Sequence, residues 1–137
     1  MTNTTSQEAI ATLLREAKTI AVVGLSSKPE RSSYGVAQYL QKHGYRVIPV
    51  NPAETEVLGE KSYASLGDIP VHVDIVDVFR RSEFVPEIAD QAIDIGAQAL
   101  WLQMGVIHEE AARKASVAGL TVVMDQCIAV DHRLLVR

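Results

Sequence analysis

The chain has 137 residues with a formal net charge of −4, and 47% of them are hydrophobic, which suits one domain with its own core. The acidic balance disfavours a general nucleic-acid or anionic-membrane binder. A single cysteine, Cys127, excludes an internal disulfide and a cysteine-cluster metal site. No apolar run approaches the roughly 20 residues of a membrane span, and the polar N-terminus lacks the order of a secretory signal. We predict a soluble, cytoplasmic protein with residues 1–7 loose and residues 8–137 forming one domain.

The predicted elements alternate between helices and buried strands. Apolar residues at helical spacing predict a first helix over residues 8–18. Mostly continuous apolar runs, typical of strands buried on both faces, then occur at residues 19–24, 46–50, 73–79, 97–103 and 120–124. Helical patterns follow the first, third and fourth of these strands. Residues 51–70 are irregular, with one short helix expected around residues 63–66.

Helix-end signals accompany this pattern. A glycine closes each inter-strand helix, at Gly44, Gly96 and Gly119. N-caps are predicted at Ser32 or Ser33 and at Ser82, and Pro86 falls in a first turn. Repeated strand–helix–strand units predict the α/β class, as a single doubly wound domain with about five parallel strands and helices on both faces.

The loop after the first strand is the most informative part of the predicted site, because ligands of open parallel sheets bind beyond the strand carboxyl ends. Gly24 is followed by Ser26, Ser27, Lys28 and Arg31 before the next helix. This order directs backbone amides and a helix dipole at a phosphate. The loop matches neither the full G-x-G-x-x-G pattern nor a P-loop. The alternative is an ordinary turn whose serines cap the helix and whose Lys28 is solvated.

The end of the second strand distinguishes between nucleotide ligands. An NAD-type site needs an acidic residue there to accept the ribose hydroxyls. This strand ends in Asn51 between Pro49 and Pro52, without an Asp or Glu, and the two prolines suggest a stiff apolar lip for an adenine. The missing acid disfavours NAD(P), which is kept as an alternative.

Several blocks of the sequence resemble the small stand-alone CoA-binding proteins, which are similar to the CoA-binding domain of the succinyl-CoA synthetase α subunit. The blocks are TIAVVGLSSKPERSSYGVAQYLQKHGYRVIPVNP, VDIVDVFR, LWLQMGV and VVMDQC, in this order. The resemblance covers roughly residues 8–130. It implies a Rossmann-like fold that binds CoA without a covalent bond along the strand ends.

The resemblance also implies which residues contact CoA. The first loop would hold the phosphates, the end of the second strand would flank the nucleotide, the end of the third would line the pantetheine path, and the last two strand ends would lie nearer the thiol. In that order the expected residues are Gly24, Leu25, Ser26, Ser27, Lys28 and Arg31; Pro49, Val50, Asn51 and Pro52; Phe79 and Arg80; and Gln103, Met104, Gly105 and Cys127.

Catalysis is not expected from this chain alone. The synthetases carry a phosphorylated histidine in a second domain, and the histidines of this chain stand singly in contexts that do not match that motif, at His43, His72, His108 and His132. We expect a non-catalytic protein that binds CoA or acyl-CoA. The alternatives are an NAD(P)-binding oxidoreductase-type domain and a CoA-binding subunit of a multi-chain acyl-CoA ligase, with a partner protein.

Four residues have more than one interpretation. Cys127 either lines the site or is inert core, with a nucleophilic role a minor third option. Asp77 either faces the crevice or is a hydrogen-bonded carboxylate at a strand end, on the face opposite to Asp74. Trp101 and Phe79 are more often core residues than ligand stacks.

Overall fold

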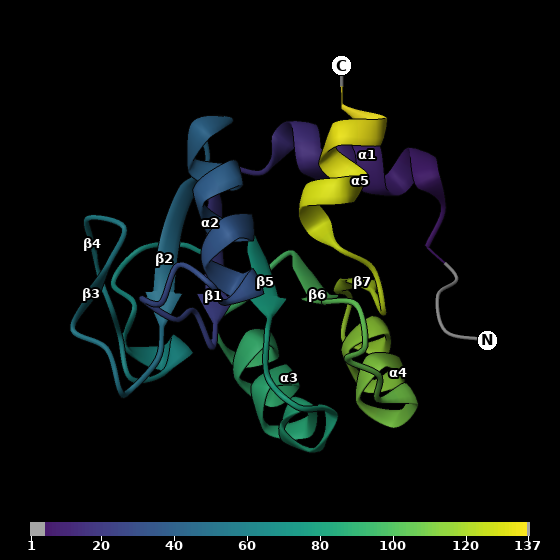
Figure 1. Ribbon diagram of the computed structural model, residues 1–137. Helices are drawn as coiled ribbons and strands as arrows, with labels where there is room; N and C mark the ends of the chain where they lie inside the picture. The colour runs from purple at the N-terminus through teal and green to yellow at the C-terminus, as the bar shows by residue number, and fades with distance from the viewer. Residues whose placement is uncertain (1–4, 137) are drawn as a thin grey trace.

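A computed structural model describes residues 5–136 and has at its centre a five-stranded parallel sheet (Figure 1). The strands lie in the order β2 (Arg46–Val50), β1 (Thr19–Val23), β5 (Ile75–Val78), β6 (Ala99–Leu102) and β7 (Thr121–Val123). All four neighbouring pairs are parallel. The predicted α/β class with five parallel strands is therefore confirmed.

Helices cover both faces of the sheet, as in a doubly wound fold (Figure 1). One face packs against α1 (Gln7–Glu16), α2 (Ser32–Lys42) and α5 (Ile128–Leu135). The other packs against α3 (Val85–Asp94) and α4 (Glu109–Val117). The chain moves from β1 outward to β2 and then returns to β5 on the other side of β1. The winding therefore reverses between β1 and β5, where such folds form their ligand crevice.

Alternate residues of the central strands form the two cores. In β1, Ile20 and Val22 pack under α1 and α2, whereas Ala21 and Val23 pack under α3. All four residues of β5 and of β6 are buried, which explains why these strands, apart from Asp77, appear as continuous apolar runs in the sequence.

The predicted glycine stops are confirmed, but the predicted serine caps are wrong. Gly44, Gly96 and Gly119 each directly follow the C-cap residue of a helix. Helix α2 begins at Ser32 with Arg31 at its N-cap and without a side-chain cap, and the Ser33 hydroxyl accepts the amide of Ser26 instead. Ser82 opens a short 3-10 turn, η2 (Ser82–Phe84), and its hydroxyl accepts the amide of Ile107. These serines tie helix starts to neighbouring loops.

The irregular segment contains a hairpin, and the short helix predicted around residues 63–66 is replaced by extended chain at Tyr63 and a 3-10 turn that starts at Leu66. Strands β3 (Glu56–Val57) and β4 (Glu60–Lys61) form the hairpin, and the 3-10 turn, η1 (Leu66–Asp68), follows. Leu58 and Gly59 turn the hairpin with φ of 54° and 78°. Such turns usually carry Asn or Asp in the first position, so Leu58 provided no signal for a turn. Tyr63 lies beside Val50 and extends the sheet edge, which excludes a helix there.

The chain start is only partly described. Residues 1–4 of the segment predicted to be loose lie outside the described residues, whereas the Ser6 hydroxyl caps α1 and the Thr5 hydroxyl donates to the carbonyl of Val122. Among the helices of residues 5–136, none combines the length and the apolar character needed to cross a bilayer.

Candidate functional site

A cavity of about 490 Å³ lies at the carboxyl edge of the sheet, beyond the ends of β5 and β6. Ligand pockets of proteins typically have volumes of about 300–1,000 Å³. Its lining residues are Ser32, Val36, Phe79, Arg80, Arg81, Gln103, Met104, Gly105, Val106 and Cys127. Six of the residues predicted from the sequence therefore meet at one cavity, although they come from three separate loops.

The ends of β1 and β5 approach each other closely at the point where the winding reverses. Gly24 follows β1 with φ of +90°, a value that side chains rarely adopt. A Cβ at this position would lie 2.7 Å from the carbonyl oxygen of Phe79 and 3.0 Å from Cδ of Arg80. Glycine is thus needed here for its φ angle and for space, which brings the first loop beside the Phe79–Arg80 end of the cavity.

Two arginines line the cavity on the side of β5. The Arg80 guanidinium lies 4.3 Å from the ring centroid of Phe84, and that of Arg81 lies 5.4 Å from it. Both guanidinium groups therefore contact the same ring, and the Arg81 side chain, which is 78% exposed, also lies 4.0 Å from Oε1 of Glu83. With Lys28 and Arg31 exposed on the loop after β1, the two arginines make this edge of the sheet cationic.

The opposite side of the cavity is formed where β6 meets the start of α5. Gln103 is 5% exposed, and its Oε1 accepts the backbone amide of Ile128 in the first turn of α5. Cys127 is the N-cap of α5 and is half-buried. Beside it Gly105 donates its amide to Asp125 Oδ1 at 2.7 Å, and Met104 is 69% exposed. The contact of Gln103 with Ile128 thereby fixes the position of the neighbouring Cys127 relative to β6. Of the two main interpretations of Cys127, a lining residue or inert core, its place in the cavity wall fits the first.

The first loop and the end of β2 are joined by hydrogen bonds but do not line this cavity. Asn51 Nδ2 donates to the carbonyl of Leu25, and the amide of Lys28 donates to the Ser26 hydroxyl. Some of the predicted contact residues have buried side chains: Leu25, Pro49 and Val50. Pro49 therefore forms no lip for an adenine, because it sits inside edge strand β2, whereas Pro52 beyond the strand is exposed.

Four lining residues were not predicted: Ser32, Val36, Arg81 and Val106. Ser32 and Val36 are four residues apart on α2, so they share the helix face at the cavity. That spacing was visible in the sequence and would have found them. Glu54 was also missed: its carboxylate accepts the amide and the hydroxyl of Ser27, at 2.9 Å each.

Asp77 is a carboxyl buried within the central sheet. It lies in β5 between Val22 of β1 and Trp101 of β6 and is fully buried. Neither carboxyl oxygen has a hydrogen-bond partner within residues 5–136, so the predicted hydrogen-bonded carboxylate was wrong. Burial raises the pKa of Asp77 well above its ordinary value. Asp74 precedes the strand and accepts the amides of Lys18 and Thr19 at 2.8 Å and 3.1 Å.

Trp101 is a core residue, the interpretation favoured from the sequence. Its side chain is fully buried, and its Nε1 donates to the carbonyl of Gln126 at 2.9 Å. Phe79 is partly buried and packs against the core while also lining the cavity.

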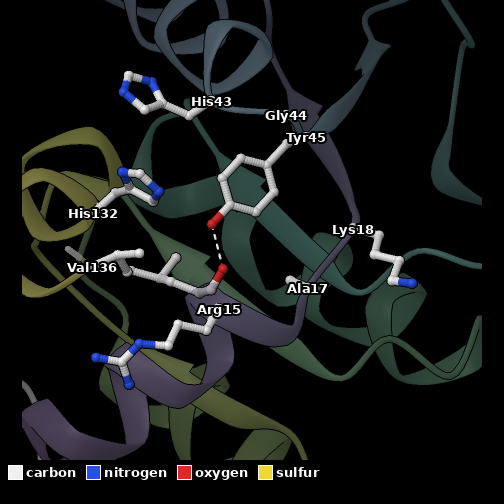
Figure 2. A pocket seen from close by; sticks show the side chains of 9 residues that line it. Arg15, Ala17, Lys18, His43, Gly44, Tyr45, His132 and Val136 are labelled. Atoms are coloured by element: carbon white, nitrogen blue, oxygen red, sulfur yellow. Dashed lines mark hydrogen bonds between the residues drawn. The ribbon is translucent and has the colours of Figure 1, made fainter.

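A second pocket, of about 330 Å³, lies at the opposite edge of the sheet, beside the amino ends of the strands, where α1, α2 and α5 end (Figure 2). His43 caps the end of α2, and its ring centroid lies 5.0 Å from that of His132, so these two histidines do not stand singly. Burial, with His43 nearby, lowers the pKa of His132. Figure 2 shows the Tyr45 hydroxyl directed at a backbone carbonyl, which is that of Leu14. The Lys18 amine is directed away from the two histidine rings.

Neither edge resembles a metal centre. Across the described part of the chain, no three or more His, Cys, Asp or Glu side chains gather as they would around a metal ion.

The strand order, with its reversal between β1 and β5, and the cavity at the carboxyl edge of the sheet define a Rossmann-like α/β domain. The chain belongs to the CoA binding domain family, whose model matches residues 18–133. The resemblance to CoA-binding proteins identified from the sequence is thereby confirmed.

Relatives of two kinds match the chain. It is 45% identical over 127 residues to the uncharacterized protein YneT of Bacillus subtilis, covering 93% of this chain and 94% of that protein. A solved hypothetical protein from Pyrococcus horikoshii superposes with a TM-score of 0.94 at 42% identity, covering 97% and 94% of the two chains. The α subunit of an ADP-forming acetate–CoA ligase II of Pyrococcus furiosus is 29% identical over 122 residues. That match covers 81% of this chain but 27% of the ligase subunit.

Proposed function

We propose that the protein binds CoA or acyl-CoA non-covalently across the carboxyl edge of the sheet and catalyses no reaction by itself. The observation that carries the proposal is the cavity beyond β5 and β6, which adjoins the loop after β1 in a chain of the CoA binding domain family. We propose the cytoplasm as its location.

The residues at this edge suit the chemistry of CoA. Its phosphates need cations and amide donors, and the candidates are Lys28, Arg31 and the start of α2, which has no side-chain cap to compete with a ligand. Its pantetheine arm needs a channel with apolar walls and a few polar groups, and Phe79, Val36 and Gln103 provide these. CoA itself supplies the thiol that carries an acyl group. The residues of the chain would hold and orient it.

A second candidate function is that of a CoA-binding subunit of a multi-chain acyl-CoA ligase. The match to the α subunit of an acetate–CoA ligase supports it, because this chain spans about a quarter of that subunit. In that function a partner protein would take part in the reaction. Co-purification of the tagged chain with an ATP-binding protein, followed by ligase activity of the complex, tests this function.

Calorimetric titration of the purified protein with CoA, dephospho-CoA and NAD tests the main proposal. A matched pair of lysines brackets β1, since Lys18 directly precedes the strand and Lys28 lies in the loop that follows it. We expect Lys28→Met to weaken CoA binding about fivefold, because it removes one cation from the phosphate site, and Lys18→Met to leave it unchanged.

The titration also distinguishes the ligands. Tighter binding of CoA than of dephospho-CoA would indicate a cation at the 3′-phosphate. Saturable binding of NAD but not of CoA would favour the alternative NAD(P) function. No saturable binding of CoA at micromolar protein concentration would refute the proposal.

A further inference from the structure

Glu54 contacts the loop that is proposed to hold the ligand's phosphates. Its Oε2 accepts both the backbone amide and the hydroxyl of Ser27, each at 2.9 Å. A backbone amide and a serine hydroxyl at the start of a βα loop are the donors that a phosphate oxygen uses. A carboxylate of the protein itself therefore engages the donors that the ligand would need.

The turn after β2 directs Glu54 at this loop. Asn51 builds the turn: its side-chain oxygen accepts the amide of Ala53, and its carbonyl accepts the amide of Glu54. The Asn51 side-chain nitrogen donates to the carbonyl of Leu25 in the first loop. One residue therefore fixes both the turn that carries Glu54 and its distance from the phosphate loop.

Glu54 is also charged at neutral pH. The Ser27 amide and then the Ser27 hydroxyl hold the pKa of its carboxyl below the ordinary value, and the charge of nearby Lys28 acts in the same direction. The Ser27 contact is thus a charge-assisted one, stronger than a contact between neutral groups.

We infer that Glu54 is an internal competitor for the anionic end of the ligand. The inference rests on the proposed function, because it concerns the same loop. A phosphate oxygen cannot occupy the Ser27 donors while the carboxylate does, and two anions at one site repel each other. A ligand with several phosphate charges and further contacts along the crevice displaces Glu54, whereas a single phosphate does not. Glu54 therefore selects for polyanionic ligands.

The charge-neutral variant Glu54→Gln tests this role. Its control is Glu56→Gln, which removes the same charge two residues along the chain, at the exposed position of strand β3. Each protein is titrated with CoA by calorimetry and with inorganic pyrophosphate while the Ser27 amide is followed by NMR. We expect Glu54→Gln to bind CoA about fivefold more tightly and its Ser27 amide to respond at lower pyrophosphate concentration, with Glu56→Gln unchanged. Glu54→Ala, which also removes the acceptor, should move both readouts in the same direction.

Equal or weaker binding by a folded Glu54→Gln variant would overturn the inference, since Glu54 would then support the loop that binds the ligand. If no variant binds CoA, the proposed function fails while the pyrophosphate titration still decides the role of Glu54. A stronger Ser27 response in Glu54→Gln than in wild type supports the competitor role, and an equal response overturns it.

Discussion

The contact between the ends of β1 and β5 makes Gly24 the most sensitive glycine of the site. A Cβ in Gly24→Ala would meet the Phe79 carbonyl at 2.7 Å, a separation that real Cβ atoms do not show. Gly44→Ala is the matched control, since Gly44 has nearly the same φ, +94° against +90°, but its Cβ would meet nothing within 4 Å. The two variants share the backbone strain, and only Gly24→Ala adds the clash.

The expected magnitudes follow from these two terms. A left-handed φ costs a residue with a Cβ about 1–2 kcal/mol, so we expect that loss in both variants. Forcing backbone apart in a packed interior adds about 1–3 kcal/mol, which applies to Gly24→Ala alone. Urea denaturation measures the free energy of unfolding of each variant, and CoA titration should show weaker binding for Gly24→Ala only. Equal destabilisation of the two variants, or unchanged CoA binding by Gly24→Ala, would refute the reasoning.

Two further predictions concern buried titratable groups, each tested by chemical denaturation across pH. The pKa of Asp77 is raised in the folded protein, so as pH rises above its ordinary pKa of about 4 the unfolded chain loses a proton that the folded chain keeps. The free energy of unfolding should then fall by about 1.4 kcal/mol per pH unit until the folded pKa is reached, and Asp77→Asn should abolish this slope. An identical slope in the variant would assign the effect to another group. The pKa of His132 is lowered, so stability should be lost as pH falls below about 6.5 toward the folded pKa, and His132→Gln should reduce that loss. A loss that is the same in His132→Gln would contradict this explanation.

The sheet was predictable because its strands are short, continuous apolar runs separated by helices that end in glycine. The irregular segment was not, because the Leu58–Gly59 turn lacks the usual turn residues, and the pairing of Tyr63 with Val50 depends on tertiary contacts. Local propensity alone therefore favoured a helix where the chain extends the sheet.

The position of the candidate site could be predicted from the sequence, but most of the contacts between its residues could not. Strand ends indicated Phe79 and Gln103, because carboxyl ends of parallel strands meet at one edge. Glu54 could not be inferred, since its contact with Ser27 depends on the turn that Asn51 builds. The contacts of Arg80 and Arg81 with the ring of Phe84 could not be inferred either, because no spacing rule describes them.

A CoA titration followed by the backbone amides in NMR spectra tests the central claim most directly. We predict saturable shifts of the amides of residues 24–28, of Phe79 and of residues 103–105, at the carboxyl edge of the sheet. The amides around His43 and Tyr45, at the opposite edge, should stay unchanged. Shifts confined to that opposite edge, or no saturable shift at all, would contradict the account.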